Sequence, residues 1–437
     1  MTKIHLEDIK MTFTKKIDEM NLMGNGITKL DGCVVFCLGA VDGDTVTCEI
    51  TQEKKNFKIA NVLSVDEPSP YRQAPDCPHF PNCGGCDLRH ISYEHELEVK
   101  KAGVEAALRK VGKGEIKVSE ILSAEPDHYR NKAVLRFDNG ICGFSEAGSD
   151  NIVSSTGCKI IPSLFCEIGA FALEFFGEEI SGVSYLFLRK NSSETEISAI
   201  LGTRDKFSYL DIEGFAEALC EKYPQVVGVL TKAGDHPEDG TEPDLILGKD
   251  YIEEDFLGLS LIVSPCSFFQ VNHAVAEKLC KKAADFALSG EGSFGADLYC
   301  GTGVIGMAIA ALHPEAFITG VEINESAVAD AKENAEENGL TNIGFFQGDS
   351  ADFAKSTYGS IDFITIDPPR AGCSEKMIKE LLRIKPQRLV YVSCDPQTLA
   401  RDLKKLTETK YDIKDVIAAD LFPRTKHVET IVLLERK

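Results

Sequence analysis

The strongest constraint on the fold is a regular alternation of strand-like and helix-like segments that begins near residue 266. Strands that alternate with helices build a mostly parallel, doubly wound sheet, and ligands bind at the carboxyl ends of its strands. The sequence therefore predicts an α/β, Rossmann-like domain over residues 266–437. The expected strands are residues 295–298, 317–321, 361–366, 388–392 and 429–434, and the expected helices are residues 274–287, 325–338, 374–383 and 396–406.

A glycine-rich turn follows the first of these strands. It reads Asp-Leu-Tyr-Cys-Gly-Thr-Gly over residues 297–303, and glycines in such a turn let the backbone approach a ligand closely. Glu322 ends the next strand about 20 residues on, where a carboxylate can accept hydrogen bonds from ribose hydroxyls. Gly301, Gly303 and Gly306 also satisfy the dinucleotide fingerprint, so this turn alone leaves a dinucleotide and S-adenosylmethionine open.

Carboxylates after the following strands favour S-adenosylmethionine. Asp349 follows the next strand, where it can meet an adenine amino group, although a simple turn residue is the alternative interpretation. Asp367 begins Asp-Pro-Pro-Arg after the strand that comes next. Because the carboxyl ends of parallel strands meet at one edge of the sheet, we expect Gly301, Glu322, Asp349 and Asp367 to line one cofactor site.

A cysteine precedes the last expected helix of this domain. Cys394 lies in Val-Ser-Cys-Asp-Pro, where a strand ends and Asp395-Pro396 begins a helix. The positive end of the helix dipole favours a thiolate there, and the strand ends share one crevice. A buried structural cysteine is the alternative, but the position beside the Asp367 motif favours a nucleophile that reaches the methyl donor.

A nucleophilic cysteine at this place suits methylation of a pyrimidine ring. Carbon 5 of uracil is a poor nucleophile, and addition of a thiolate at carbon 6 makes it enolate-like and able to attack a methyl group. A base must then remove the carbon 5 proton so that the cysteine is eliminated. Glu429, in His-Val-Glu-Thr on the last expected strand, is the candidate base, with a surface carboxylate as the alternative.

Two further segments precede this domain. Residues 1–62 hold short apolar stretches between glycines and predict a small, OB-like β-barrel.

Residues 63–265 mix strands and helices, and they begin with a proline-rich stretch that carries three closely spaced cysteines. Four thiolates bind either zinc or an iron–sulfur cluster, and spacing alone slightly favours zinc. The expected ligands are Cys77, Cys83, Cys86 and, 72 residues after Cys86, Cys158.

Five motifs in this order resemble the bacterial RNA uracil-5-methyltransferases, the family that contains the 23S rRNA and tRNA enzymes. The motifs are SFFQVN at 267–272, DLYCG at 297–301, IDPPR at 366–370, VSCDP at 392–396 and HVE at 427–429. The resemblance spans nearly the full length of the chain. It implies a class I methyltransferase domain that uses S-adenosylmethionine, with Cys394 as nucleophile and Glu429 as base.

The resemblance also implies roles for the remaining parts. It implies that Gln270, Tyr299, Glu322 and Asp367 contact S-adenosylmethionine or the neighbouring base. It implies that the four cysteines carry a [4Fe-4S] cluster in a central α+β domain, and that the N-terminal barrel is similar to the RNA-binding TRAM domain of this family. Because tRNA-specific members are shorter and typically lack both features, the resemblance favours 23S rRNA over tRNA as the substrate.

The charge of the chain constrains where RNA binds. The chain has 69 acidic and 47 basic residues and a formal net charge of -22, which excludes a generally basic nucleic-acid coat. We therefore expect the RNA contacts to be concentrated in a few places. The basic groups that suggest themselves are Lys15-Lys16, Lys54-Lys55, Arg130 with Lys132, and Arg189-Lys190.

A dinucleotide-dependent oxidoreductase with an iron–sulfur centre is the second hypothesis, and it predicts the absorbance of a bound nicotinamide or flavin.

The chain has no apolar run of membrane-spanning length and no secretory pattern at its start. Its 15 cysteines are an odd number, which favours reduced thiols or metal ligands over disulfides. We therefore expect a cytoplasmic, monomeric enzyme without a membrane partner.

Overall fold

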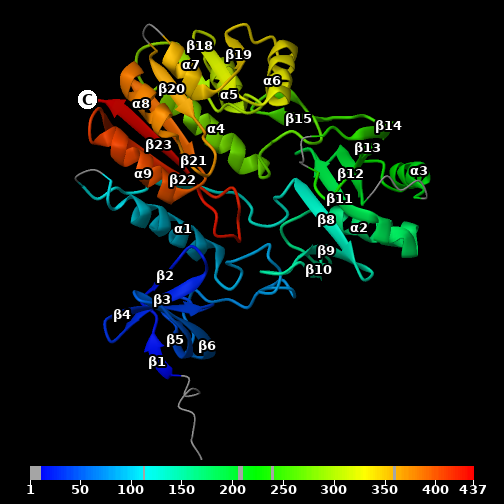
Figure 1. The fold of residues 1–437 in the computed structure, drawn as a ribbon, viewed down its shortest axis with the longest axis vertical. Coiled ribbons are helices and arrows are strands. Elements are labelled where there is room, and N and C mark those ends of the chain that lie inside the picture. The colour runs from blue at the N-terminus through cyan, green and yellow to red at the C-terminus, as the bar shows by residue number, and fades with distance from the viewer. Residues whose placement is uncertain (1–10, 112–113, 205–209, 238–240, 358–360) are drawn as a thin grey trace, which may run out of the picture.

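The computed structural model describes residues 11–111, 114–204, 210–237, 241–357 and 361–437. Three large β-sheets follow one another along the chain, and Figure 1 shows them as separate regions from blue through green to red. The third of these regions carries the candidate site. None of the described helices is long and apolar enough to cross a lipid bilayer.

The first sheet is a small, barrel-like sheet with the strand order β1-β5-β6-β4-β3-β2. Register shifts between β5 and β6 bend these two long strands, so that Ile17, Val35 and Val46 enclose a core of their own. It matches the predicted N-terminal fold class. Its strands are β1 (Thr12–Lys16), β2 (Glu19–Met20), β3 (Asn25–Leu30), β4 (Cys33–Leu38), β5 (Thr45–Glu53) and β6 (Phe57–Glu67).

The second sheet has the order β10-β9-β8-β11-β12-β13-β14, and α2 and α3 cover one of its faces. Phe165 and Phe215 of these helices pack in the core beside buried strand residues such as Leu186 and Ile197. The elements are β8 (Lys132–Asp138), β9 (Ile141–Ser145), β10 (Ile152–Ser154), α2 (Ser163–Phe176), the 3-10 helix η1 (Gly177–Gly182), β11 (Val183–Lys190), β12 (Ile197–Thr203), α3 (Ile212–Lys222), β13 (Val226–Ala233) and β14 (Asp244–Gly248).

The third sheet has eight strands in the order β19-β18-β17-β20-β21-β23-β22-β7. The first five are parallel, which confirms the predicted doubly wound α/β architecture. Before it come the hairpin β15 (Ile252–Phe256) and β16 (Leu259–Val263) and the helix α4 (His273–Ala287). The others are β17 (Phe294–Leu298), α5 (Val304–Leu312), β18 (Phe317–Glu322), α6 (Glu325–Glu337), β19 (Ile343–Gln347), α7 (Ser350–Ser356), β20 (Phe363–Ile366), α8 (Glu375–Ile384), β21 (Arg388–Ser393), α9 (Pro396–Thr407), β22 (Tyr411–Ala419) and β23 (Glu429–Arg436).

Two strands of this sheet were not predicted. β22 is antiparallel to β23, and β23 in turn is antiparallel to β21, so the sheet is mixed at this end. The first half of β22 alternates charged residues such as Asp412 and Lys414 with apolar ones, which hid it among polar segments. The short strand β7 (Glu120–Leu122) pairs with β22, although it precedes the whole second sheet in the sequence.

The segment before the second sheet packs against the third one. Helix α1 (Tyr93–Leu108) contributes Val104 and Leu108 to the same core as Leu399 and Leu403 of α9. Figure 1 shows α1 next to α9 and β22. The division of the chain into domains after residues 62 and 265 stays a prediction. Helix α1 lies before residue 265 in the sequence but packs against α9 and β22 of the third sheet.

Candidate active site

The turn after β17 has the backbone of a ligand-binding loop. Tyr299, Gly301 and Gly303 have φ values of 60°, 54° and 78°, so three of five consecutive residues lie in the left-handed region. A Cβ at Gly303 would lie 2.5 Å from the ring of Phe345. The buried carboxylate of Asp297 fixes the far side of the turn, because it accepts a hydrogen bond of 2.9 Å from the Gly306 N–H.

Glu322 lies directly beside this turn, as the sequence predicted. Its Oε2 accepts the N–H of Gly301 at 3.1 Å, and its Oε1 accepts the N–H groups of Ile323 and Asn324 at 2.8 and 2.9 Å. These three bonds hold the carboxylate at the carboxyl end of β18. The side chain is therefore fixed next to the backbone that a nucleotide approaches.

The next strand end is tied to the same place. The N–H of Tyr299 donates to the Ser350 hydroxyl at 3.0 Å, and the N–H of Gly348 donates to the Glu322 carbonyl at 2.8 Å. Asp349, between them, is the N-cap of α7, and its side chain accepts the N–H of Asp352 at 2.8 Å. Asp349 thus has a capping function, and contact with a cofactor stays a prediction.

The segment that contains Gln270 packs on the glycine-rich turn from the other side. The Thr302 hydroxyl donates to the carbonyl of Phe268 at 3.5 Å. The side chain of Asn131, just before β8, donates to the Gln270 carbonyl at 3.0 Å. Phe268 is 64% exposed at this place, an aromatic ring that the sequence motif contained but that had no predicted role.

Strand pairing brings Cys394 and Glu429 together. In the antiparallel register of β21 and β23, Ser393 pairs with Thr430. The residue after Ser393 therefore lies opposite the residue before Thr430, which places Cys394 opposite Glu429. Asp367 follows β20, the parallel neighbour of β21. The pKa of the Cys394 thiol is raised by both carboxylates, which shows that the three groups lie in one electrostatic environment.

The ionisation of Cys394 differs from the prediction. Burial, followed by the negative charges of Glu429 and Asp367, raises the pKa of this thiol to about 11. The helix dipole of α9 was expected to favour the thiolate, but desolvation and two carboxylates outweigh it. The surroundings of Cys394 therefore favour the protonated thiol over the thiolate.

Both carboxyl groups beside Cys394 are also difficult to ionise. Burial, followed by Asp367, raises the pKa of Glu429 to about 8, and Glu429 is only 8% exposed. Burial, followed by Asp297, raises the pKa of Asp367 to about 7. A carboxyl group with a pKa near neutrality can take and release a proton, which a surface strand carboxylate does far less well.

Arg370 is a site residue that the prediction did not assign. Its positive charge lowers the pKa values of Cys394 and Glu429 and thus partly offsets their burial. The residue lies in the IDPPR motif, so its place in the sequence was noticed. Cys394 and Glu429 lie 24 and 59 positions further along the chain. The effect of Arg370 on them depends on the strand order of the third sheet, which the sequence did not predict.

A row of carboxylates links the two halves of the site. The pKa of Asp297 is raised to about 6 by burial and, to a smaller extent, by Glu322, and Asp297 in turn raises the pKa of Asp367. Asp297 and Asp367 are therefore electrostatic neighbours at the carboxyl ends of β17 and β20, between the glycine-rich turn and Cys394.

Comparisons with known proteins agree with this geometry. Residues 241–437 match the model of the tRNA (uracil-5-)-methyltransferase family. A protein of Caldanaerobacter subterraneus subsp. tengcongensis, described as an uncharacterized RNA methyltransferase, is 33% identical over 97% of this chain and 98% of its own length. A similarly described protein of Listeria monocytogenes is 32% identical over 96% of both chains. This chain belongs to the RNA methyltransferases.

The crystal structure of the Pyrococcus abyssi tRNA (uracil-54, C5)-methyltransferase in complex with S-adenosyl-L-homocysteine has the same fold. It superposes with a TM-score of 0.77 at 26% identity and covers 97% of this methyltransferase and 100% of its own chain. The N-terminal and middle regions are therefore shared along with the catalytic sheet.

The four predicted cluster cysteines of this methyltransferase are neighbours. Burial and then the thiols of Cys158 and Cys77 raise the pKa of Cys83, with a backbone hydrogen bond opposing. Burial and then Cys158 and Cys83 raise that of Cys86 to about 11, opposed by Arg89. Within the described residues, however, no group of three or more His, Cys, Asp or Glu side chains has the arrangement of a metal site.

The surroundings of these thiols supply a positive charge. Arg89 is fully buried, and its guanidinium pairs with Asp76 at 2.7 Å and Asp127 at 3.0 Å and hydrogen-bonds the Cys86 thiol. Over the described part of the chain its Nε has no hydrogen-bond partner. A buried cation with an unused donor beside four thiols fits a group with a negative charge, such as a thiolate-bound cluster.

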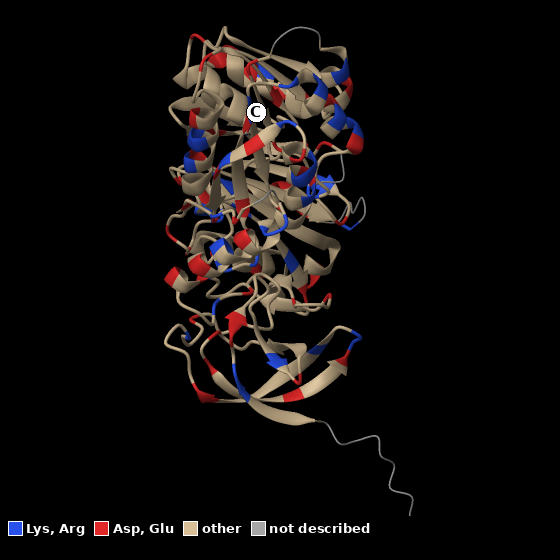
Figure 2. Ribbon diagram, turned by 90° about the vertical axis from the view of Figure 1, so that its left-hand side faces the viewer, with Lys and Arg blue, Asp and Glu red and all other residues tan. Residues whose placement is uncertain are grey.

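One of the predicted RNA contacts is wrong. Arg189 and Lys190 are 2% and 8% exposed, because they lie on the central strand β11 of the second sheet. Arg189 donates to the carbonyls of Ser264 and Ser267, so it holds the segment before Gln270 rather than facing solvent. Lys15-Lys16 and Lys54-Lys55 are exposed on the first sheet, and Figure 2 shows basic and acidic residues interspersed there.

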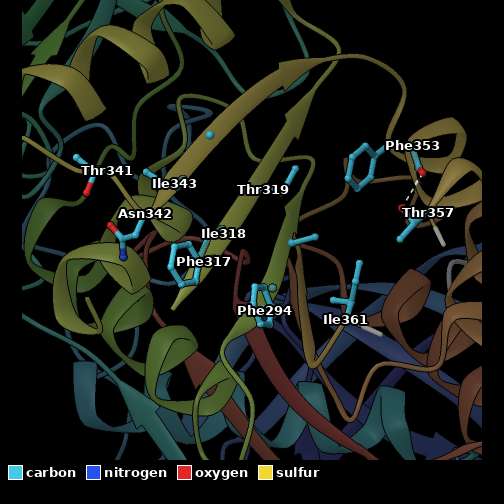
Figure 3. Close-up of a pocket in the computed structure, with 13 residues that line it drawn as sticks. Phe294, Phe317, Ile318, Thr319, Thr341, Asn342, Ile343, Phe353, Thr357 and Ile361 are labelled. Atoms are coloured by element: carbon cyan, nitrogen blue, oxygen red, sulfur yellow. Dashed lines mark hydrogen bonds between the residues drawn. The ribbon is translucent and has the colours of Figure 1, made fainter. Parts of the chain in front are cut away.

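A cavity of about 440 Å³ lies away from this site. It opens at the amino ends of β17, β18 and β19, between the rings of Phe294, Phe317 and Phe353 (Figure 3). Cys394 and Glu322 lie at the opposite, carboxyl ends of the sheet. The cavity is therefore separate from the candidate active site.

Proposed function

We propose that Cys394 and Glu429 catalyse the transfer of a methyl group from S-adenosylmethionine to carbon 5 of a uridine in RNA. The observation that carries this proposal is the register of β21 and β23, which places Cys394 opposite the buried carboxyl group of Glu429 and close to Asp367. Family membership supplies the reaction class, and this geometry supplies a nucleophile and a base.

In the first step the Cys394 thiol, which is only partly buried, gives its proton to solvent, and its Sγ forms a bond to carbon 6 of the uracil. The electron pair of the carbon 5–carbon 6 double bond moves onto the ring as an enolate. S-adenosylmethionine supplies an electrophilic methyl group, and its positive charge favours the ionised forms of the nearby thiol and carboxyl groups. Carbon 5 then forms a bond to that methyl group, and the bond from the methyl group to sulfur breaks.

In the second step Glu429 takes the proton from carbon 5. The electron pair of that carbon–hydrogen bond restores the double bond, and the bond from carbon 6 to Cys394 breaks to return the thiolate. Burial keeps Glu429 away from water, and Arg370 favours its ionised form before the proton arrives. The pKa of about 8 allows this carboxyl group to hold the proton until it is passed to solvent.

The proposed donor site combines predicted residues at or just after the carboxyl ends of β17, β18, β19 and β20. The backbone at Gly301 allows a ligand to approach closely, and Glu322, which bonds to it, offers a carboxylate to the ribose. Tyr299 precedes this turn, and its backbone N–H is bonded to Ser350. Asp349 faces the same strand end, and Asp367 lies toward Cys394. We assign Gln270 and the exposed ring of Phe268 to the target base, because aromatic rings stack on bases turned out of a helix.

We further propose that Cys77, Cys83, Cys86 and Cys158 hold a [4Fe-4S] cluster, with Arg89 as its charge partner. Two observations support this assignment. Neighbouring thiols of this group raise the pKa values of Cys83 and Cys86, and the Nε of Arg89 has no hydrogen-bond partner within the described residues. Purified enzyme is expected to contain four irons per chain and to absorb broadly in the visible range. Tightly bound zinc without iron would overturn it.

The substrate is proposed to be 23S rRNA, with tRNA as the second candidate. The preference for rRNA rested on the presence of the N-terminal and cysteine-bearing regions. The Pyrococcus enzyme acts on tRNA by its name, and it covers 97% of this chain, so these regions do not separate the two substrates. We assign RNA binding to the first sheet, with Lys15, Lys16, Lys54 and Lys55 as contacts.

Transcripts of 23S rRNA and of tRNA, incubated with the enzyme and S-adenosylmethionine, test this function. Mass spectrometry is expected to find 5-methyluridine at defined positions in one of them. The Cys394→Ala variant is expected to form none and to lose covalent capture of 5-fluorouridine RNA, whereas Cys220→Ala, a half-buried cysteine of α3, keeps both. Methylation by Cys394→Ala, or none by the unchanged enzyme on either RNA, would reject the proposal.

A further inference from the structure

The loop that leads into Glu429 is held by a distant part of the chain. It runs from Asp420, after β22, to Val428, before β23, and we call it the β22–β23 loop. Arg424, in its middle, has a φ of 68°, a left-handed conformation that is unfavourable for a residue with a side chain. Such a conformation persists only where neighbouring groups fix it, and here these groups lie in residues 87–100.

The centre of the loop bonds to the segment directly after Cys86. The carbonyl of Arg424 accepts the N–H groups of Asp87 and Leu88 at 2.8 and 3.1 Å. The N–H of Arg424 donates to the buried carboxylate of Glu96 at 2.7 Å. Its guanidinium donates to the carbonyl of Ile91 at 3.2 Å. The backbone N–H, the carbonyl and one guanidinium nitrogen of this strained residue are therefore bonded to residues between Asp87 and Glu96.

Both ends of the loop have similar bonds. At the start, Asp420 accepts the Lys100 ammonium at 2.5 Å and the Tyr93 hydroxyl at 2.8 Å, and Lys100 and Asp420 are fully buried. At the end, Oδ2 of Asp87 accepts the N–H of Lys426 at 3.0 Å. Lys426 is three residues before Glu429, so this bond acts on the loop close to the base.

We propose that Asp87 is a positioning residue for the catalytic base: its carboxylate and backbone N–H hold the β22–β23 loop so that Glu429 faces Cys394. This inference rests on the proposed function, because it assigns proton removal to Glu429. Cys394 is held by its own strand and helix, so Asp87 acts on the second chemical step and leaves the first one intact. The cysteine-bearing segment thereby becomes a structural part of the active site.

The test measures the two steps separately in single turnovers. The full-length enzyme acts on 23S rRNA and tRNA transcripts that carry tritium at carbon 5 of uridine, with S-adenosylmethionine labelled with carbon-14 in its methyl group. Methyl transfer is followed as carbon-14 in RNA, and proton removal as tritium released to water. Because a displacement of about 1 Å in a reacting group can reduce a rate 100-fold, we expect Asp87→Ala to slow tritium release at least about tenfold.

In the same variant methyl transfer stays within about twofold, and a methylated RNA–protein adduct that survives denaturation accumulates. Asp87→Asn keeps an oxygen that accepts the Lys426 N–H, and it is expected to recover most of the release rate. Glu105→Ala is the matched control: Glu105 of α1 also accepts a backbone N–H, that of Val118 at 3.1 Å, and has no described contact with the loop. It is expected to change neither rate.

An equal loss of both rates in Asp87→Ala, or no loss of either, would overturn the positioning function. If Asp87→Ala does not fold, Tyr93→Phe removes one bond at the other end of the loop and is expected to give the same selective loss at smaller size. A failure of the proposed function is distinguishable, because unchanged enzyme would then release no tritium, or Glu429→Gln would release it at the normal rate.

Discussion

The proposed nucleophile and the proposed base of this methyltransferase are supported in opposite ways. Cys394 lies between β21 and α9, and Asp395 beside it caps that helix by accepting the N–H groups of Gln397 and Thr398 at 2.9 and 2.8 Å. Glu429 begins β23, but the loop before it is fixed by residues more than 300 positions earlier in the chain. One catalytic group is thus positioned locally, and the other by a part of the chain outside the catalytic sheet.

The local support of the nucleophile extends to the Arg370 segment. The hydroxyl of Thr398 donates to the Arg370 carbonyl at 3.1 Å. Asp402, buried on α9, accepts the N–H of Cys373 and the Tyr391 hydroxyl, both at 2.8 Å. Helix α9 therefore fixes the thiol and the cation beside it as one unit. The difference between the two regions teaches that the two chemical steps depend on different parts of the protein.

Glu429→Gln separates the two steps most strongly. The amide cannot take the carbon 5 proton, and general bases contribute about 100- to 10,000-fold to a rate, so tritium release is expected to fall by that factor. Methyl transfer continues once, and the methylated adduct persists on a denaturing gel.

Glu435→Gln, a half-exposed carboxylate on the same strand, is the control and is expected to turn over normally. Normal release of tritium by Glu429→Gln would show that another group is the base. The contrast between the two regions would then have no catalytic meaning.

Asp402→Asn is expected to give the reverse of Asp87→Ala. The asparagine cannot accept all the bonds that the carboxylate accepts, and a buried donor without its partner costs about 1–3 kcal/mol. We expect methyl transfer and capture of 5-fluorouridine RNA to slow about tenfold, since a few kcal/mol corresponds to that factor or more. Adducts that do form resolve at the normal rate, because Glu429 is unaffected.

Single-turnover kinetics of Asp402→Asn and Asp87→Ala, measured side by side, provide the check. Selective loss of proton removal in Asp402→Asn would contradict the separate support of the two groups. Tyr391→Phe removes one of the three bonds to Asp402, the others coming from the Cys373 N–H and the Arg401 guanidinium, and its rates are expected to lie between those of this variant and the unchanged enzyme.

The local half of the site could be read from the sequence, and the distant half could not. Gly301 and Glu322 were paired by a spacing that one strand–turn–helix unit fixes, and Cys394 was placed by a strand end and a helix cap. Glu429 was found only as part of a motif. Its place opposite Cys394 depends on β23 lying between β21 and β22, and β22 was not predicted. The contacts of Asp87 and Lys100 join residues far apart in the chain, and no local pattern indicates them.

Ionisation was the second part that the sequence could not give. The dipole of α9 is a local property and predicted a thiolate, whereas burial and neighbouring carboxylates are properties of the assembled sheet. The same reason explains Arg189, whose charge suggested a surface contact but whose strand is central in the second sheet. Patterns along the chain predict elements and their ends, and the environment of a charge follows only from their packing.

The smallest expected effect concerns stability at different pH values. Burial raises the pKa of Glu429 to about 8, so between its ordinary value and pH 8 the folded chain keeps a proton that the unfolded chain releases. The free energy of unfolding therefore falls as the pH rises through this window. Glu429→Gln removes the titrating group, and its Tm relative to unchanged enzyme is expected to increase by a few degrees from pH 5 to pH 8.

Scanning calorimetry of both proteins at several pH values measures this difference. The pKa of Asp367 is also raised, to about 7, and its effect is present in both proteins and largely cancels in the comparison. A Tm difference that stays constant with pH would mean that Glu429 is ionised and solvated in the folded chain. The β22–β23 loop would then leave the base open to water, and the contrast between the locally held thiol and the distantly held base would lose its physical reason.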